Sequence, residues 1–153
     1  MAKRTRNCLT LTNYPKKGII VIHCSGTPNS NTSVGFDYIN ELHKSRFPPA
    51  CVNGTKIYCG YHYIIKKDGT VEKGRPENIL GQHAQKINAK SLGICLIGTG
   101  NAKTDGSTFT DSTNGIDSIA NPAQKVSLKQ LLVKLMNKYK ITANNVIGHH
   151  DVY

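Results

Sequence analysis

An apolar run that ends in a histidine constrains the fold of this chain more than any other segment. Residues 18–25 read Gly-Ile-Ile-Val-Ile-His-Cys-Ser, so four β-prone apolar residues stand between a glycine and a polar loop. A continuous run of this length is typical of a strand that is buried on both faces of a sheet. His23 closes the run, where an imidazole is held rigidly enough to be a metal ligand or a catalytic base. A core histidine with satisfied hydrogen bonds is the alternative.

The C-terminal end of the chain repeats this arrangement. Residues 146–151 read Val-Ile-Gly-His-His-Asp, a short β-prone run that leads to His149, with a carboxylate two residues later that can orient an imidazole. Zinc favours imidazole ligands, and a catalytic zinc site has about three protein ligands and an open position for water. His23 and His149 therefore indicate part of the ligand set of a zinc hydrolase, although the residues alone leave structural histidines open.

The segments after the first strand predict a helix, a second strand and a hairpin. A helix is expected from Ser33, as N-cap, to about Arg46. Residues 57–65 are rich in aromatic and branched side chains and predict a strand. An Asp-Gly turn follows, and residues 70–73 are expected to pair back as a hairpin.

The second half of the chain predicts another buried strand and a long helix. Residues 91–98 form a further apolar run, whereas residues 99–120 are polar and are expected to form a long surface excursion. Asn121-Pro122-Ala123-Gln124 predicts a helix start with a capping box, and an apolar stripe begins at Val126. Strands that alternate with helices predict a single α/β domain with a central mixed β-sheet flanked by helices.

Length and composition exclude several classes of protein. The 153 residues, with 38% hydrophobic and 19% charged side chains, suit one globular domain rather than a disordered chain. No apolar run approaches the roughly 20 residues of a membrane span. The first residues are basic, but no apolar segment of a secretory signal follows them, so the protein is expected to be cytoplasmic when synthesised. Residues 1–17 are expected to form a basic arm, and residues 18–153 the domain.

The formal net charge of +11 predicts an anionic partner, with an ordinary charged, solvated surface as the alternative that explains most of the lysines. Nucleic acid and an anionic polymer such as the bacterial cell wall both fit. Nucleic acid is disfavoured because the Lys and Arg residues are dispersed and form no basic helix, zinc finger or aromatic RNA-binding motif. The five cysteines are an odd number without a CxxC pair, which favours a reduced chain; Cys51 and Cys59 are the one pair expected to be able to form a disulfide.

Several segments together resemble one known family, and they occur in its order from about Gly18 to the last residue. They are Val-Ile-His-Cys-Ser (21–25), Gly-Tyr-His-Tyr-Ile-Ile-Lys-Lys-Asp-Gly-Thr-Val-Glu (60–72), Gly-Gln-His-Ala (81–84), Ser-Leu-Gly-Ile-Cys-Leu-Ile-Gly (91–98), Pro-Ala-Gln (122–124) and Ile-Gly-His-His-Asp (147–151). The chain thereby resembles the zinc-dependent N-acetylmuramoyl-L-alanine amidases, which include amidase-type phage lysozymes and peptidoglycan recognition proteins.

This resemblance implies a fold, an activity and residue roles. The fold would be a single α/β domain of the amidase and peptidoglycan-recognition-protein type. The activity would be hydrolysis, by zinc-activated water, of the amide between N-acetylmuramic acid and L-alanine in peptidoglycan, as in a phage or prophage endolysin that acts on the cell wall after release. His23 and His149 match zinc ligands, Tyr61 matches a catalytic tyrosine, and His83 matches a histidine in the substrate groove. His62 and His43 are expected to be structural.

The sequence also departs from the family's pattern. The family's third zinc ligand, a Cys or Asp, follows the second histidine by several residues, often with a catalytic Lys two residues before it. This chain ends at Tyr153, so its domain is expected to lack the C-terminal end of the motif. Either the sequence is truncated, or the third ligand comes from elsewhere, or the site is incomplete; Asp151 could replace the ligand or equally only support one. We therefore expect low or absent hydrolysis from these 153 residues. The alternative function is a non-catalytic module that binds peptidoglycan in the same groove.

Overall fold

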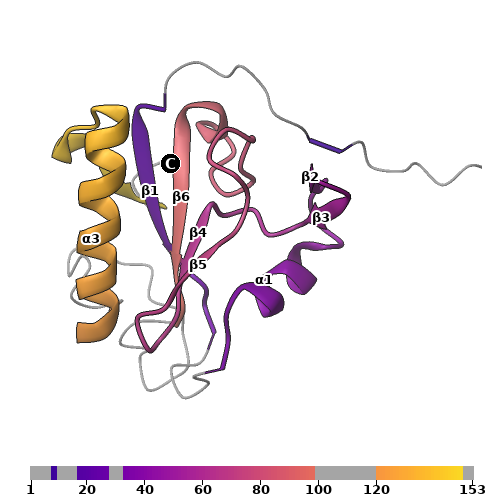
Figure 1. Cartoon of the computed structure of the whole chain (residues 1–153), viewed down its shortest axis with the longest axis horizontal. Helices are drawn as coiled ribbons and strands as arrows, with labels where there is room; N and C mark the ends of the chain where they lie inside the picture. Colours follow the sequence, from indigo (N-terminus) through magenta and orange to yellow (C-terminus); the bar gives the residue numbers. More distant parts are fainter. Residues whose placement is uncertain (1–7, 10–16, 28–32, 99–119, 150–153) are drawn as a thin grey trace, which may run out of the picture.

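The computed structural model of the chain describes residues 8–9, 17–27, 33–98 and 120–149. Its centre is a mixed sheet in the order β5-β4-β6-β1-β7, of which β1, β4, β5 and β6 are labelled in Figure 1. The strands are β1 (Ile19–Cys24), β4 (Tyr63–Ile65), β5 (Val71–Lys73), β6 (Ser91–Leu96) and β7 (Val146–Gly148). β1 pairs in parallel with both β6 and β7, β4 pairs in parallel with β6, and β5 is antiparallel to β4. The predicted mixed α/β sheet is confirmed.

Helix α3 (Pro122–Tyr139) covers one face of the sheet. The predicted capping box is present, because Asn121 and Gln124 exchange hydrogen bonds between side chain and backbone. The Gln124 amide nitrogen also donates to the carbonyls of Ile65 and Ile97, which fixes the helix start to the strand ends. Val126, expected in the apolar stripe, is instead 60% exposed, because the buried side of the helix is formed by Gln124, Leu128, Leu131 and Leu135.

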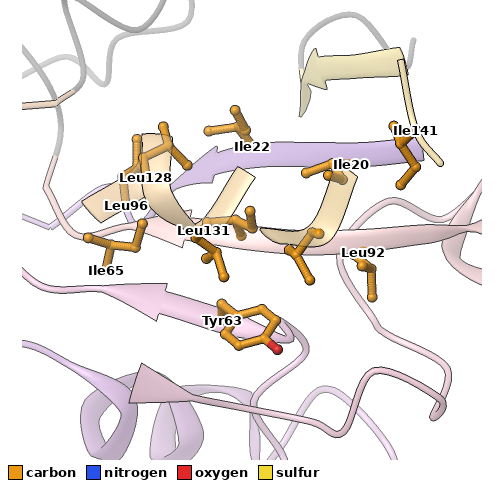
Figure 2. Close-up of a cluster of buried hydrophobic side chains, with 11 residues drawn as sticks. Ile20, Ile22, Tyr63, Ile65, Leu92, Leu96, Leu128, Leu131 and Ile141 are labelled. Atoms are coloured by element: carbon orange, nitrogen blue, oxygen red, sulfur yellow. The ribbon is translucent and has the colours of Figure 1, made fainter. Parts of the chain in front are cut away.

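The core between α3 and the sheet consists mainly of Ile and Leu side chains, together with Tyr63, as Figure 2 shows. On β1 the alternate residues Ile20 and Ile22 point into this core. The helix contributes Leu128, Leu131 and Leu135. Because successive strand residues point to opposite faces, Val21 and His23 lie on the other side of the sheet.

Helix α1 (Phe36–His43) lies on that other side, where Ile39 packs with Ile64, Cys95 and Ile97. It is shorter than the predicted 33–46, and Ser33 is not its cap: the helix N-cap is Gly35, without a side-chain hydrogen bond. The carboxylate of Glu72 accepts the N–H of Phe36 at 2.9 Å, so an acidic group from the hairpin stabilises the positive end of the helix instead.

The predicted strand over 57–65 is interrupted in the structure. β3 (Thr55–Ile57) ends at the first residue of this range, β4 starts at Tyr63, and residues 58–62 between them belong to neither sheet. Their backbone is bound by side chains of α1: Asn40 Oδ1 accepts the N–H groups of Tyr58 and Cys59, at 2.7 and 2.9 Å. A β-prone composition does not reveal that these donors are taken by a helix rather than by another strand.

The expectation of a reduced chain and that of a Cys51–Cys59 pair are both wrong. Cys59 is a buried free thiol, and Cys51 forms a disulfide with Cys8. β2 (Ala50–Val52) and β3 form a small separate hairpin. Leu9 pairs with Ala50, the first residue of β2. This pairing attaches residues 8–9 to the hairpin and brings the two sulfurs together. The other residues of the predicted arm before Lys17 lie outside the described residues, as do residues 99–119 of the predicted surface excursion. None of the helices within the described ranges is long and apolar enough to cross a membrane.

The disulfide is expected to stabilise the fold. It closes a loop with a sequence separation of 43 residues, for which chain entropy sets an upper bound of about 4 kcal/mol. Reduction should lower the melting temperature by roughly 5–15 °C, measured by circular dichroism with and without a reductant. Cys8→Ser should melt at the reduced temperature, and its melting should no longer respond to the reductant. Identical melting curves for the oxidised and reduced wild type would contradict the expectation.

Glu77 connects β4 to the end of α3. Its carboxylate accepts hydrogen bonds from the hydroxyls of Tyr63 and Tyr139 and from Lys138 Nζ at 2.7 Å. Burial alone would raise the pKa of Glu77, but the donors of Lys138, Tyr139 and Tyr63 outweigh it and hold this pKa at about 2. The depressed pKa means that the charged carboxylate stabilises the fold.

We expect Glu77→Gln to lower the free energy of unfolding at pH 7 by about 1–2 kcal/mol, since charge-assisted hydrogen bonds become neutral ones. The wild-type advantage should be complete above the ordinary glutamate pKa near 4.3. It should fade as the pH falls toward about 2, where the folded protein also binds the proton. Urea unfolding of both proteins from pH 7 to pH 2 measures this. A difference that does not change with pH would show that the charge of Glu77 is not involved.

Candidate active site

His23 is the residue around which the polar side chains of the α1 face gather. It lies next to last in β1, opposite Cys95 of β6, and is only 5% exposed. Burial, and next the charge that His149 can carry, lower the pKa of His23 to about 3. The imidazole is therefore neutral at physiological pH and has a lone pair to give to a metal ion.

His149 follows β7 directly and lies beside His23. Gly148 of β7 pairs with Ile22 of the adjacent parallel strand β1. The residues that follow them, His149 and His23, therefore lie at the same level of the sheet. The two ring centroids are 4.5 Å apart, with 42° between the ring planes. His149 is exposed, in contrast to His23, and burial lowers its pKa as well. The two histidines that the sequence singled out are thus brought together near the β7 edge of the sheet.

Tyr61 completes this group from the segment before β4. Its ring centroid is 5.0 Å from that of His23. The hydroxyl contacts the thiol of Cys95, and burial raises the pKa of Tyr61 well above its usual range. The phenol therefore stays protonated and can donate a hydrogen bond throughout the physiological range.

Side chains of α1 hold the backbone next to Tyr61. His43 Nδ1 accepts the N–H of Gly60 at 2.9 Å, and its ring lies 5.5 Å from the Tyr61 ring. Burial lowers the pKa of His43 to about 4, and the positive charges of Arg46 and Arg75 add to this effect. His43 is therefore neutral and can serve as this acceptor. Its contacts suit the structural role expected for it.

Arg75 is a second positioning group that the sequence did not reveal. Its side chain is almost completely buried, at 1% exposure, and burial lowers its pKa to about 10. The backbone N–H of Arg75 donates to the Tyr61 carbonyl at 3.0 Å. Among the described residues, the guanidinium donates to four backbone carbonyls, those of Cys59 at 2.7 Å, Leu80 at 3.0 Å, Pro48 at 2.7 Å and Tyr58 at 3.2 Å.

His62 and His83 lie next to this group but have different partners. His62 is buried; its Nδ1 accepts the N–H of Gly93 at 3.0 Å and its Nε2 bonds the Ile79 carbonyl at 2.9 Å. Both nitrogens are therefore used by the backbone, as expected of a structural histidine. His83, predicted to lie in the substrate groove, places Nδ1 2.9 Å from Nε2 of His23. A substrate contact of His83 remains a prediction.

The donor set suits zinc in part. Two imidazoles that follow adjacent strands in this way are typical zinc ligands, and the phenol ring of Tyr61 lies beside that of His23. Within the described ranges, no group of three His, Cys, Asp or Glu side chains is arranged to hold a metal ion. His150 and Asp151, which follow His149, lie outside those ranges. The described residues therefore fit two positions of a zinc site, those of His23 and His149.

Comparisons with known proteins show the family to which the chain belongs. A model of the N-acetylmuramoyl-L-alanine amidase family matches residues 14–153. The endolysin of Escherichia phage T7 is 38% identical over 133 residues, which are 87% of this chain and 74% of that protein. The endolysin of Enterobacteria phage T3 has the same identity and coverage.

Solved structures give the same result. The endolysin N-acetylmuramoyl-L-alanine amidase LysCS of Clostridium intestinale has a TM-score of 0.69 and 32% identity, covering 100% of this chain and 80% of that one. Drosophila PGRP-LB, with a TM-score of 0.66 and 23% identity, covers 98% of this chain and 78% of its own, and shows the shared fold.

The chain therefore belongs to the N-acetylmuramoyl-L-alanine amidase family. Within that family it is an amidase of the phage endolysin type, since its similarity to such endolysins extends over most of both chains. The family, the fold and the class of enzyme inferred from the sequence motifs are confirmed. The roles of His23, His149, Tyr61 and His83 remain predictions.

The Arg75 arrangement yields a prediction about stability. Arg75→Met would leave several buried carbonyls without a donor, so we expect the free energy of unfolding to fall by about 2–4 kcal/mol. Lys73→Met removes a cation from an exposed position of the neighbouring strand and should change it by less than about 0.5 kcal/mol. Urea unfolding at constant pH measures both. Equal stability of the two variants would mean that the guanidinium bonds do not support the fold.

Proposed function

We propose that the chain hydrolyses the amide between the lactyl group of N-acetylmuramic acid and the L-alanine of the peptidoglycan stem peptide. In this proposal His23 and His149 are two ligands of a zinc ion, and Tyr61 assists the reaction at the scissile carbonyl. The main support is the approach of the two rings, whose centroids lie 4.5 Å apart although the residues are far apart in the sequence. The neutral state that burial gives His23 supports its role as a ligand.

A zinc ion bound at this position would supply activated water and polarise the scissile carbonyl. Water adds to the carbonyl carbon, the carbon–nitrogen bond breaks, and the leaving nitrogen takes up a proton. The products are the lactyl carboxylate and a stem peptide with a free alanine amine. The role of this chain's residues is to hold the ligands in register and to place a donor near the carbonyl oxygen.

Tyr61 is suited to be that donor. Its raised pKa keeps the proton on the phenol oxygen, which can then donate to the oxyanion that develops in the transition state. The present partner of the hydroxyl is the Cys95 thiol, and sulfur is a weak acceptor. Exchange of this contact for a charged oxygen is therefore favourable.

The substrate and the charge of the chain agree. The net charge of +11 attracts the anionic polymers of a bacterial wall, and electrostatic attraction raises the rate of encounter more than the specificity. We propose that the protein is made in the cytoplasm and acts on the wall after its release, with peptidoglycan and not nucleic acid as its partner.

The test measures zinc binding and hydrolysis together. Free alanine amino termini released from purified peptidoglycan are counted, with and without a chelator, and bound zinc is measured after dialysis. We expect hydrolysis to require zinc and to be slow, because the described residues provide two zinc ligands and no third. His23→Ala and His149→Ala should each lose zinc and activity, while Tyr61→Phe should retain zinc and lose activity by about a hundredfold.

His150→Ala is the matched control, because it removes a neighbouring histidine that the proposal does not use, and it should behave as the wild type. Chelator-insensitive binding of peptidoglycan by the wild type, without release of amino termini, would overturn the proposal in favour of a non-catalytic binding module. Full zinc content in His23→Ala would refute the assigned ligand.

A further inference from the structure

The contact between His83 and His23 is a hydrogen bond between two imidazoles. Nδ1 of His83 lies 2.9 Å from Nε2 of His23, and the rings meet edge to face, with 89° between their planes. On the far side, Nε2 of His83 lies 3.4 Å from the hydroxyl oxygen of Ser91. His83 thus stands between the candidate ligand and a hydroxyl at the start of β6.

Two glycines leave room for the His83 ring in this position. A Cβ atom on Gly93 would lie 2.6 Å from His83 Cγ, and one on Gly81 would lie 2.6 Å from Cδ2. The backbone is fixed as well, because Asn88 Oδ1 accepts the N–H groups of His83 and Ala84, at 3.0 and 2.8 Å. The ring is therefore held against β6 with one nitrogen aimed at His23.

Only one placement of the proton in this hydrogen bond is compatible with metal binding. A neutral imidazole carries its proton on one nitrogen and accepts with the other. If His83 donated to His23 Nε2, the His23 proton would be on Nδ1, and neither of its nitrogens would have a lone pair for a metal. If His23 donates from Nε2, its Nδ1 lone pair is available, and His83 carries its own proton on Nε2, facing Ser91.

We propose that His83 is a positioning residue for His23: it accepts the proton of His23 Nε2 and thereby selects Nδ1 of His23 as the metal-binding nitrogen. This inference rests on the proposed zinc site. Ligand histidines in metalloproteins commonly donate their second N–H to such an acceptor, and loss of the acceptor weakens metal binding by about 10- to 100-fold. Here the acceptor is another imidazole instead of a carboxylate or a carbonyl.

The first test does not need zinc. Long-range proton–nitrogen NMR of metal-free, histidine-labelled wild type distinguishes the two imidazole tautomers, with His23→Gln used to assign the resonances. We expect His23 to be protonated on Nε2 and His83 to be protonated on Nε2 as well. A His23 proton on Nδ1 would overturn the inference even if zinc still bound.

The second test compares two variants of nearly equal shape. His83→Asn keeps an acceptor close to the position of Nδ1, whereas His83→Leu has similar size and no acceptor. Zinc titration monitored by NMR of His23 should give His83→Asn an affinity within about threefold of the wild type, and His83→Leu an affinity about 10- to 100-fold weaker. Melting curves show whether both variants are folded.

The outcomes separate this inference from the proposed function. Equal zinc affinity of the Asn and Leu variants would overturn the inference and leave the zinc site intact. A wild type that binds no zinc would overturn the proposed site, while the metal-free tautomers would still decide whether His83 accepts from His23. If His83→Leu does not fold, the wild-type spectrum alone decides the question.

Discussion

The parallel pairing of β1 with β6 and β7 is the constraint on which the site depends. Ile22 lies between Ile94 on one side and Gly148 on the other. Backbone hydrogen bonds therefore bring His23 and His149 together, rather than any attraction between the rings. Two imidazoles would repel each other if both were protonated, and the burial that lowers the pKa of His23 to about 3 keeps at least that ring neutral. The sheet thus holds a pair of side chains that would not associate by themselves.

Successive side chains of β1 point to opposite faces of the sheet, so the apolar core lies on one face and the candidate site on the other. Ile20 and Ile22 bury their side chains against α3, in a core without polar side chains from the strand. Val21 and His23 lie on the α1 side, where polar groups are buried but hydrogen-bonded. A polar residue can therefore occupy the middle of the domain, because the apolar contacts on the opposite face compensate for its desolvation.

The sequence predicted what depends on local pattern. Continuous apolar runs located β1 and β6, the Asn-Pro-Ala-Gln segment located the start of α3, and two histidines at strand ends pointed to the site. It did not reveal Arg75 as the group that ties together four backbone carbonyls, nor the Cys8–Cys51 disulfide. Both depend on contacts between segments far apart in the chain, for which a composition or a spacing has no local signal. The prediction of one continuous strand over 57–65 was wrong for the same reason.

The hydrogen bonds of the histidines distinguish structural rings from a candidate ligand. The lone pair of His62 accepts the N–H of Gly93, and that of His43 accepts the N–H of Gly60. Neither ring can bind a metal without leaving a buried backbone donor unsatisfied, which would cost about 1–3 kcal/mol. His23 differs because its partner is the ring of His83. His83 can accept the hydrogen bond from the N–H of His23, so the lone pair on the other nitrogen of His23 stays available. The presence of a histidine does not by itself indicate a metal ligand. An imidazole can bind a metal ion only if the backbone does not already use its lone pair.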